Sequence, residues 1–172
     1  MSAKYALLGL IFLLSCSAHE KDEPKEVDAY VPVYIPLEAM RDVHVNPNKK
    51  LFESGKIYIK GNLLLINEPE KGVHIFDNTD PENPKRLNFV AIPGNQDIEM
   101  NGDLLYADNG LDLVTLSLVN PAEPKLINRV ENVFSMPLYP PYQNVKFVCA
   151  EESKGYVISW VLDKVVNPNC RR

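Results

Sequence analysis

The chain has 172 residues, of which 23 are acidic and 18 are basic, so its formal net charge is −5 at pH 7. Without a cluster of Lys and Arg, this balance argues against nucleic acid as a partner, because nucleic-acid binding depends on cations that neutralise phosphates. It also argues against purely electrostatic adhesion to anionic lipid.

Residues 1–15 have the pattern of a secretory signal peptide. Lys4 supplies one positive charge, and residues 5–14 are an unbroken run of apolar or small residues. A basic start, an apolar core and small residues after it are typical of an export signal. The apolar run is shorter than the ~20 residues that a membrane-spanning helix needs. We therefore predict that residues 1–15 are removed on export.

The end of this segment, Leu13-Leu14-Ser15-Cys16, resembles the lipobox of bacterial lipoproteins. In that family the Cys receives a diacylglycerol, the peptide bond before it is cut, and the new amine is usually acylated. The resemblance implies a protein anchored to a membrane through a lipid on Cys16, because about two acyl chains make a stable anchor. The alternative is an ordinary signal peptide with an unrelated Cys near its cleavage site.

Residues 16–29 are predicted to form a flexible acidic tether, because no large apolar residue occurs before Val27. Within it, Lys21-Asp22-Glu23 resembles the acidic export signal of lipoproteins in Bacteroidetes-type bacteria. This resemblance implies a cell-envelope location at the outer membrane. It leaves open whether the protein lies on the periplasmic face or on the cell surface.

A single β-rich domain is expected over residues 30–170. Residues 30–36 look like a strand whose prolines place it at a sheet edge. Residues 37–43 are compatible with a short helix that starts after Pro36.

Residues 55–133 contain an internal repeat of about 40 residues. Gly61 and Gly102 lie in predicted hairpin turns and are 41 residues apart, and the Pro-x-x-Pro segments that begin at Pro81 and Pro121 are 40 residues apart. Two independent landmarks at nearly one spacing define units over about 55–96 and 97–133.

Each unit is predicted to contain three or four short strands. The prolines remove backbone donors, so their segments form turns and not central strands. About forty residues with this content is the period of a β-propeller blade. A third unit, over 143–166, is degenerate because it offers one strand and no Pro-x-x-Pro turn.

The order Gly-Asn-x-Leu, an Ile- and Val-rich strand and Asp-Pro-x-x-Pro resembles the LVIVD repeat, most strongly over residues 55–133. The second unit departs from the pattern because Asn120 replaces the usual Asp. That family forms β-propeller-like domains and is frequent in exported lipoproteins of Bacteroidetes-type bacteria. The resemblance implies an all-β fold of about two to three blades.

A closed propeller needs about four or more blades, so we expect an incomplete propeller. Its open edge and apolar faces then need cover, either from residues 136–142 or from a protein partner.

One aromatic segment is a candidate binding patch. Its members are Phe134, Met136, Tyr139 and Tyr142. Exposed aromatic side chains favour recognition. The alternative, which the sequence favours, is a hydrophobic loop that covers the open end of the sheet.

Two cysteines remain besides Cys16. Because an exported chain meets an oxidising compartment, Cys149 and Cys170 are candidates for a disulfide. The preferred prediction is instead that Cys149 is a buried thiol within an apolar run. No Cys/His spacing indicates a metal site, and no cofactor is expected.

The titratable residues show no catalytic pattern. His19, His44 and His74 have no Ser, Cys or Asp at a recognisable spacing, and His74 is predicted to face solvent. Asp97 and Glu99 share one strand face and could bind a cation, but exposed strand charges are the expected interpretation. The remaining aspartates of interest are predicted to be turn and strand-end residues: Asp77, Asp80, Asp108 and Asp112.

Three hypotheses for function follow. The first is a non-enzymatic lipoprotein whose β-repeat domain serves in binding or assembly at the cell envelope. The second is an enzyme or glycan-processing accessory on a propeller scaffold, which should gather acids and aromatics at one mouth. The third is a fragment of a longer repeat protein with no role of its own.

Overall fold

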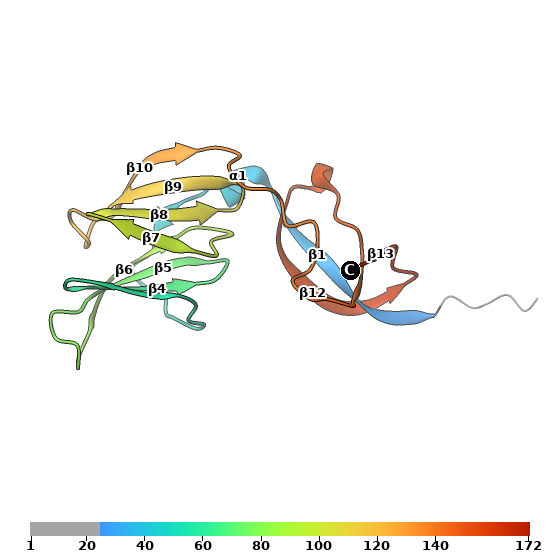
Figure 1. The fold of residues 1–172 in the computed structure, drawn as a ribbon, viewed down its shortest axis with the longest axis horizontal. Coiled ribbons are helices and arrows are strands. Elements are labelled where there is room, and N and C mark those ends of the chain that lie inside the picture. The colour runs from blue at the N-terminus through green and yellow to red at the C-terminus, as the bar shows by residue number, and fades with distance from the viewer. Residues whose placement is uncertain (1–24) are drawn as a thin grey trace, which may run out of the picture.

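The computed structural model describes residues 25–172 (Figure 1). The predicted signal peptide, Cys16, His19 and most of the predicted tether lie outside this range. Nearly all of the regular structure is β-strand, which confirms the all-β prediction. Within residues 25–172, no helix is long and apolar enough to span a bilayer.

The first repeat unit folds into a five-stranded antiparallel sheet with the strand order β2-β6-β5-β4-β3. The strands are β2 (His44–Val45), β3 (Ile57–Lys60), β4 (Leu63–Glu68), β5 (Gly72–Asp77) and β6 (Lys85–Ala91). The last four are consecutive hairpins, as expected for one blade, and the short β2 joins at the edge beside β6.

The second repeat unit forms a four-stranded antiparallel sheet with the order β10-β9-β8-β7. The strands are β7 (Ile98–Asn101), β8 (Leu104–Asn109), β9 (Asp112–Ser117) and β10 (Lys125–Val130). We call these two sheets the blade pair.

The two blades match each other in detail. Gly61 has φ +55° and Gly102 has φ +60°, and each begins the two-residue turn after the first strand of its blade. A Cβ atom at either position would meet nothing within 4 Å, so the backbone conformation and not space favours glycine there. The register between the last two strands also shifts at equivalent places, beside Leu87 and Ile127.

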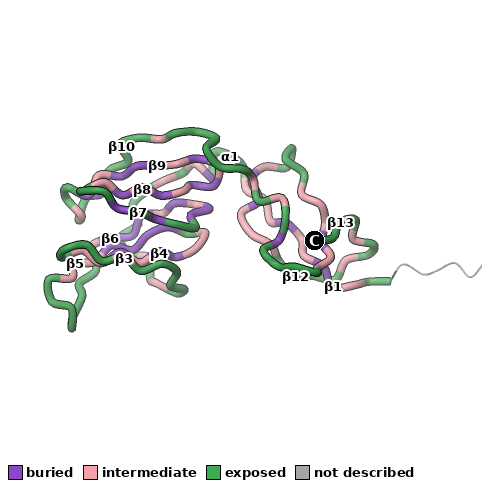
Figure 2. Tube along the Cα trace, in the orientation of Figure 1, coloured by how far each residue is buried: buried purple, intermediate pink, exposed green. Residues whose placement is uncertain are grey.

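The blade pair shares one hydrophobic core between the facing sides of its sheets (Figure 2). The core side chains come from both blades: Leu65, Val73, Ile75, Val90 and Ile92 from the first, and Ile98, Met100, Leu105, Val114, Leu116 and Leu118 from the second. Two lysine side chains also cross between the blades, one from the residue before β3 and one from the last residue of β3. Lys56 donates to the Ile98 carbonyl and Lys60 to the Gly102 carbonyl, both at 2.8 Å.

The two ends of the described chain build a third sheet, with the order β12-β1-β11-β13. Its strands are β1 (Glu26–Ile35), β11 (Lys146–Phe147), β12 (Tyr156–Val166) and β13 (Cys170–Arg171). We call it the terminal sheet, and it forms the second lobe in Figure 1. A 3-10 turn, η1 (Glu152–Lys154), precedes β12.

Three expectations need correction at the terminal sheet. Strand β1 begins at Glu26, so the last residues of the predicted tether belong to the fold. β1 is not an edge strand, because it pairs antiparallel with β12 along its length and with β11 at Tyr30. The segment 143–166 does not form a blade by itself, because its long strand takes its neighbour from the other end of the chain.

The predicted short helix exists as one turn, α1 (Leu37–Met40), after Pro36. It connects the terminal sheet to the blade pair. Met40 is fully buried, and a Cβ atom on Gly110 would lie 2.6 Å from its sulfur. The positive φ of Gly110, +62°, and this close approach of α1 together favour glycine in the turn between β8 and β9.

Candidate functional site

A cavity of about 390 Å³ lies where the blade pair, the loop after β10 and strand β12 meet. We call it the junction cleft. The first blade contributes Glu70 and Gly94 from its turns, and the second contributes Asp108 and Gly110. The remaining wall comes from the loop between β10 and β11 and from residues 156–160 of β12.

Two glycines shape the floor of the junction cleft. Gly94 and Gly110 both have positive φ, at +75° and +62°. A Cβ atom on Gly94 would lie 3.1 Å from the backbone of Gly110 and 3.2 Å from the Tyr156 ring. The turns of the two blades thus approach each other and this ring closely because neither carries a side chain.

Four aromatic side chains line the junction cleft: Phe134, Tyr139, Tyr156 and Trp160. Tyr156 and Trp160 are four residues apart on β12, so strand alternation places them on one face. Phe147 of β11 supports this wall, with its ring edge-on to Trp160 at 5.5 Å and to Tyr139 at 6.1 Å between centroids. The Trp160 Nε1 is buried and has no hydrogen-bond partner within residues 25–172.

Two carboxylates, and no Lys or Arg, lie among the lining residues of the junction cleft. Asp108 Oδ1 accepts from the backbone N–H groups of Gln96 and Asp97, each at 2.9 Å, and so holds the turn between the blades. Burial raises the pKa of Glu70. Burial, together with the charges of Asp108 and Glu70, raises the pKa of Tyr156 to about 12. Tyr156 therefore keeps its proton at neutral pH and can donate a hydrogen bond.

The predicted aromatic patch does not form one surface. Phe134 and Tyr139 line the junction cleft, whereas Met136 lines a neighbouring cavity of about 390 Å³ beside Leu37. Tyr142 stacks on Tyr30 of β1, with ring centroids 4.8 Å apart, and covers the terminal sheet. The binding and covering interpretations therefore apply to different residues of the same loop.

The preferred prediction of a free Cys149 thiol is wrong, because Cys149 and Cys170 form a disulfide. Phe147 of β11 pairs directly with Cys170 of β13, which brings Cys149 close to it. The two Cα atoms are 5.3 Å apart, within the usual range for a disulfide. Strands β11 and β13 have only two residues each, too few to give a sequence pattern from which this pairing could be predicted.

The expectation that His74 faces solvent is also wrong. Its side chain is fully buried, and Nε2 lies 2.8 Å from Glu68 Oε2. Lys49 donates to the other oxygen of Glu68 at 3.0 Å. Burial lowers the His74 pKa, so a neutral ring donates its Nε2 proton to the carboxylate. Strand β5 is covered on both faces, so the usual alternation of buried and exposed residues does not apply to it. The apolar neighbours Val73 and Ile75 are the sequence feature that could have indicated a buried strand.

Asp112 begins strand β9, as a strand-end residue should, but it is fully buried in an ion network that sequence reasoning missed. Arg41 Nε and Arg129 Nη1 each lie 2.8 Å from its Oδ2, and the Asn132 N–H donates at 3.0 Å to Oδ1. Burial opposes ionisation, but these hydrogen bonds outweigh it and keep the pKa of Asp112 below its usual range. The network is structural, since it ties the residue after α1 to the second blade.

The other predicted titratable residues lie at the surface. Asp97 and Glu99 are exposed and pair with Lys56 at 2.9 and 3.7 Å. Asp77 and Asp80 accept hydrogen bonds from backbone N–H groups two residues later, as turn residues do. The remaining described histidine is also exposed: His44 Nδ1 lies 3.2 Å from a carboxylate oxygen of Asp42. In the part of the chain from residue 25 onward, no group of His, Cys, Asp or Glu side chains could hold a metal ion.

Comparison with known proteins adds no relative. No family model, no curated protein and no solved structure matches the chain, so the resemblance to the LVIVD repeat stays a prediction.

Proposed function

We propose that this protein is a non-catalytic binding module, held at the cell envelope by a lipid on Cys16, whose ligand occupies the junction cleft. The observation that carries the proposal is the convergence of aromatic rings and carboxylates from distant segments on one cavity. Its volume lies within the range of small-molecule sites, which are mostly apolar with a few placed polar groups.

The charge of the junction cleft indicates the ligand class. Glu70 and Asp108 contribute two acidic side chains, and no basic residue is in the lining. A cation gains both from carboxylates and from the face of an aromatic ring such as Trp160. The ring of Tyr139 is already in a cation–π contact, with the Arg172 guanidinium 5.7 Å from its centroid, so Tyr139 contributes an apolar wall. We therefore infer a ligand with an organic cationic group, for example an amine or quaternary ammonium.

A second candidate is a glycan-binding or glycan-processing accessory. Acids and aromatics at one mouth were the sign that this hypothesis required, and the fold brings such residues together although they are far apart in sequence. Glycosidases use carboxylate pairs, and aromatic rings offer broad apolar faces to a ligand. The two candidates differ in ligand charge, which makes them separable.

The single tryptophan of the chain, Trp160, lines the junction cleft, so its fluorescence reports binding directly. Choline and a neutral oligosaccharide should be titrated separately. We expect choline to change the emission and its affinity to weaken with added salt. Binding of the oligosaccharide alone, independent of salt, would favour the second candidate.

Tyr139→Ala tests whether the signal comes from the junction cleft. Tyr139 is 56% exposed, so its removal should leave the fold intact and weaken binding about five- to tenfold, as loss of one apolar wall of the cleft predicts. Tyr142→Ala is the matched control, because Tyr142 is 51% exposed but stacks on Tyr30 outside the cleft. Equal effects of the two substitutions would contradict the assignment.

The anchor is tested separately. Cys16→Ser should abolish the incorporation of labelled palmitate into the full chain, because no lipid can be attached. Ser17→Ala, which keeps the thiol, should be labelled like the wild type. If Cys16→Ser is still labelled, the lipid assignment is wrong.

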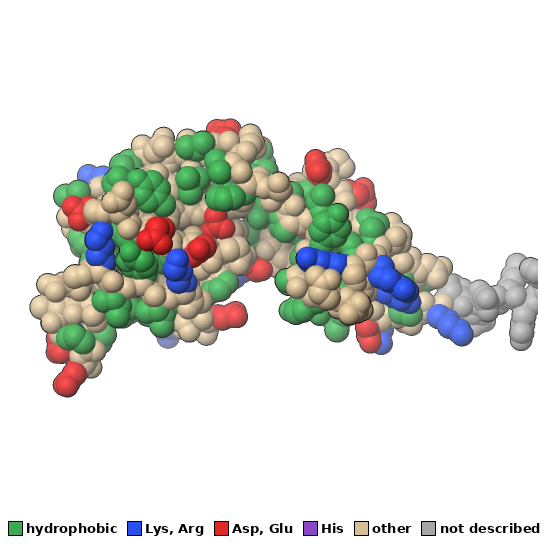
Figure 3. Space-filling view, viewed as in Figure 1, with side chains coloured by type: hydrophobic (Ala, Val, Ile, Leu, Met, Phe, Trp, Pro, Cys, Tyr) green, Lys and Arg blue, Asp and Glu red, His purple; other side chains and the backbone are tan. Residues whose placement is uncertain are grey.

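A partner at the open edge is the assembly part of the proposal. The edge strands β3 and β10 expose large apolar side chains: Ile57, Ile59, Leu126, Ile127 and Val130. Figure 3 shows apolar side chains on the surface of the blade pair. Light scattering of residues 25–172 should show self-association, and a stable monomer at high concentration would count against a partner of the same chain.

A further inference from the structure

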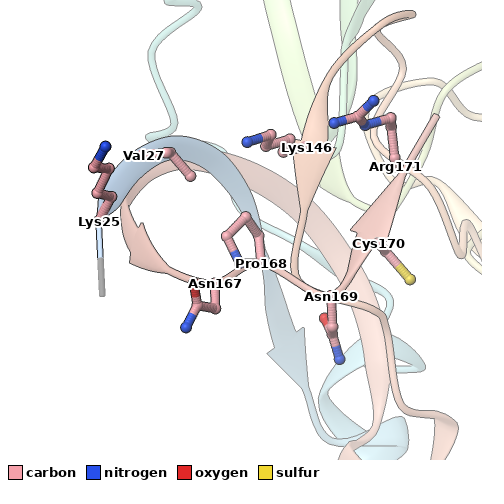
Figure 4. Close-up of a pocket in the computed structure, with 8 residues that line it drawn as sticks. All are labelled: Lys25, Val27, Lys146, Asn167, Pro168, Asn169, Cys170 and Arg171. Carbon is pink, nitrogen blue, oxygen red and sulfur yellow. The ribbon is translucent and has the colours of Figure 1, made fainter. Parts of the chain in front are cut away.

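A further cavity, of about 560 Å³, lies in the terminal sheet at the opposite end from the blades. We call it the basic pocket. Lys25 lies on one side of it, Lys146 and Arg171 lie on the other, and residues 167–169 connect the sides (Figure 4). No Asp or Glu is among the lining residues. The chain is acidic overall, so this local excess of positive charge opposes its average.

Strand alternation produces the charge separation at the start of β1. Lys25 and Val27 line the basic pocket, so Glu26 and Asp28 point to the other face. There Asp28 pairs with Lys164 at 2.7 Å. The acidic residues nearest in sequence are thus turned away from the basic pocket.

Lys146 and Arg171 are directly opposed partners in the β11–β13 pair. Like charges at such positions destabilise a sheet. Within residues 25–172, neither side chain forms an ion pair that would offset the repulsion. A fold that keeps two cations face to face is suited to an anion that bridges them.

The backbone around the basic pocket is tightly held. Cys170 is crosslinked to Cys149, and Asn169 Oδ1 accepts from the Cys149 N–H at 3.1 Å. Val145 and Arg172 exchange backbone hydrogen bonds at 3.2 and 3.0 Å. The backbone that carries Lys146 and Arg171 is therefore fixed before any ligand arrives, which lowers the entropic cost of binding.

We propose that the basic pocket binds the phosphate of an anionic lipid headgroup in the membrane that carries the anchor. Lys25 is nine residues from Cys16, so even a fully extended chain spans only about 30 Å between them. Orientation toward that membrane rests on the proposed lipid at Cys16, whereas headgroup binding itself does not. The contact would direct the junction cleft, at the other end of the terminal sheet, away from the bilayer.

The test uses residues 17–172, which contain every strand of the fold and lack both the apolar leader and Cys16. Binding to vesicles of phosphatidylglycerol and of phosphatidylcholine is compared by cosedimentation. We expect binding to the anionic vesicles only. Each basic side chain near an anionic surface strengthens binding about fivefold, so Lys146→Gln with Arg171→Gln should weaken it about 25-fold.

The matched control is Lys50→Gln with Lys125→Gln, which removes the same charge from exposed positions on and beside the blade pair. It should bind like the wild type. Equal loss in both double variants would indicate general charge attraction and would overturn the pocket assignment, as would no loss in either. The melting temperature of the pocket variant should stay equal or rise, because a repulsive pair is removed; a marked fall would show a structural role and would also overturn the proposal.

Inorganic phosphate is the second arm, followed by NMR shifts of the residue 146 and 171 amides. Shifts with phosphate but no vesicle binding would overturn the headgroup as ligand. This outcome differs from a failure of the lipid anchor, which appears only in the palmitate labelling of Cys16→Ser.

Discussion

The blade pair and the terminal sheet have the same type of secondary structure but reach it differently. In the blade pair, each strand from β3 to β6 and from β7 to β10 pairs with its neighbour in the sequence. In the terminal sheet, β1 pairs with β12 from the far end of the chain. Hairpins close short loops at little entropic cost, whereas joining chain ends requires long loops to be closed.

The terminal sheet relies on a few specific ties because its own core is small. Its own buried apolar side chains are few, with Ala29, Phe147, Tyr156 and Val157 the main ones. A disulfide crosslinks it, and the Asp112 network after α1 attaches it to the second blade. The comparison indicates that non-local strand pairing depends on a small number of specific bonds, whereas the blade pair depends on a shared apolar core.

Loss of the Asp112 network should have the largest effect. Asp112→Asn leaves Arg41 and Arg129 without their buried carboxylate, and removal of one partner of a buried pair costs about 3–5 kcal/mol. Urea unfolding should show this as a lower free energy of unfolding. Asp103→Asn, at an exposed turn, should change it little. If both variants are equally stable, the network does not hold the two regions together.

Removal of the disulfide should have the next effect and should be local. Cys149 and Cys170 are 21 residues apart, and closing a loop of this size contributes about 3 kcal/mol. In the double Ser variant, hydrogen exchange should accelerate in β12 while the amides of β8 keep their protection. Equal acceleration in both strands would show that the terminal sheet and the blade pair unfold as one unit.

The smallest effect expected is a pH dependence within the first blade. Burial lowers the pKa of His74 in the folded state, so the unfolded chain binds a proton more readily. The free energy of unfolding should therefore be constant above about pH 6.5, the ordinary His value, and should decrease as the pH falls below it.

Stability measured at a series of pH values checks this. His74→Gln should remove the decrease between pH 6.5 and 5, and His44→Gln, at an exposed position, should retain it. A decrease that survives in His74→Gln would assign it to another group.

The features predicted correctly from sequence are local ones. The all-β class, the turns at Gly61 and Gly102 and the single turn of α1 all depend on neighbouring residues and on backbone conformation. Besides the three corrections at the terminal sheet, the errors concern the side chains of His74 and Cys149, and Asp112 was placed correctly at a strand end without its partners. Each of these side chains is defined by a partner on a separate turn or strand.

The residues of the junction cleft divide in the same way, into those that the sequence could indicate and those that it could not. Its aromatic loop was recognisable because Phe134 and Tyr139 lie in one short segment. Glu70, Asp108 and Trp160 were not recognisable as its companions, because three different elements bring them there. Periodicity and turn chemistry act over a few residues, and so they determined the blades. Packing of the chain ends against those blades acts over the whole chain, and only the tertiary structure decided where the cleft, the disulfide and the buried ion network lie.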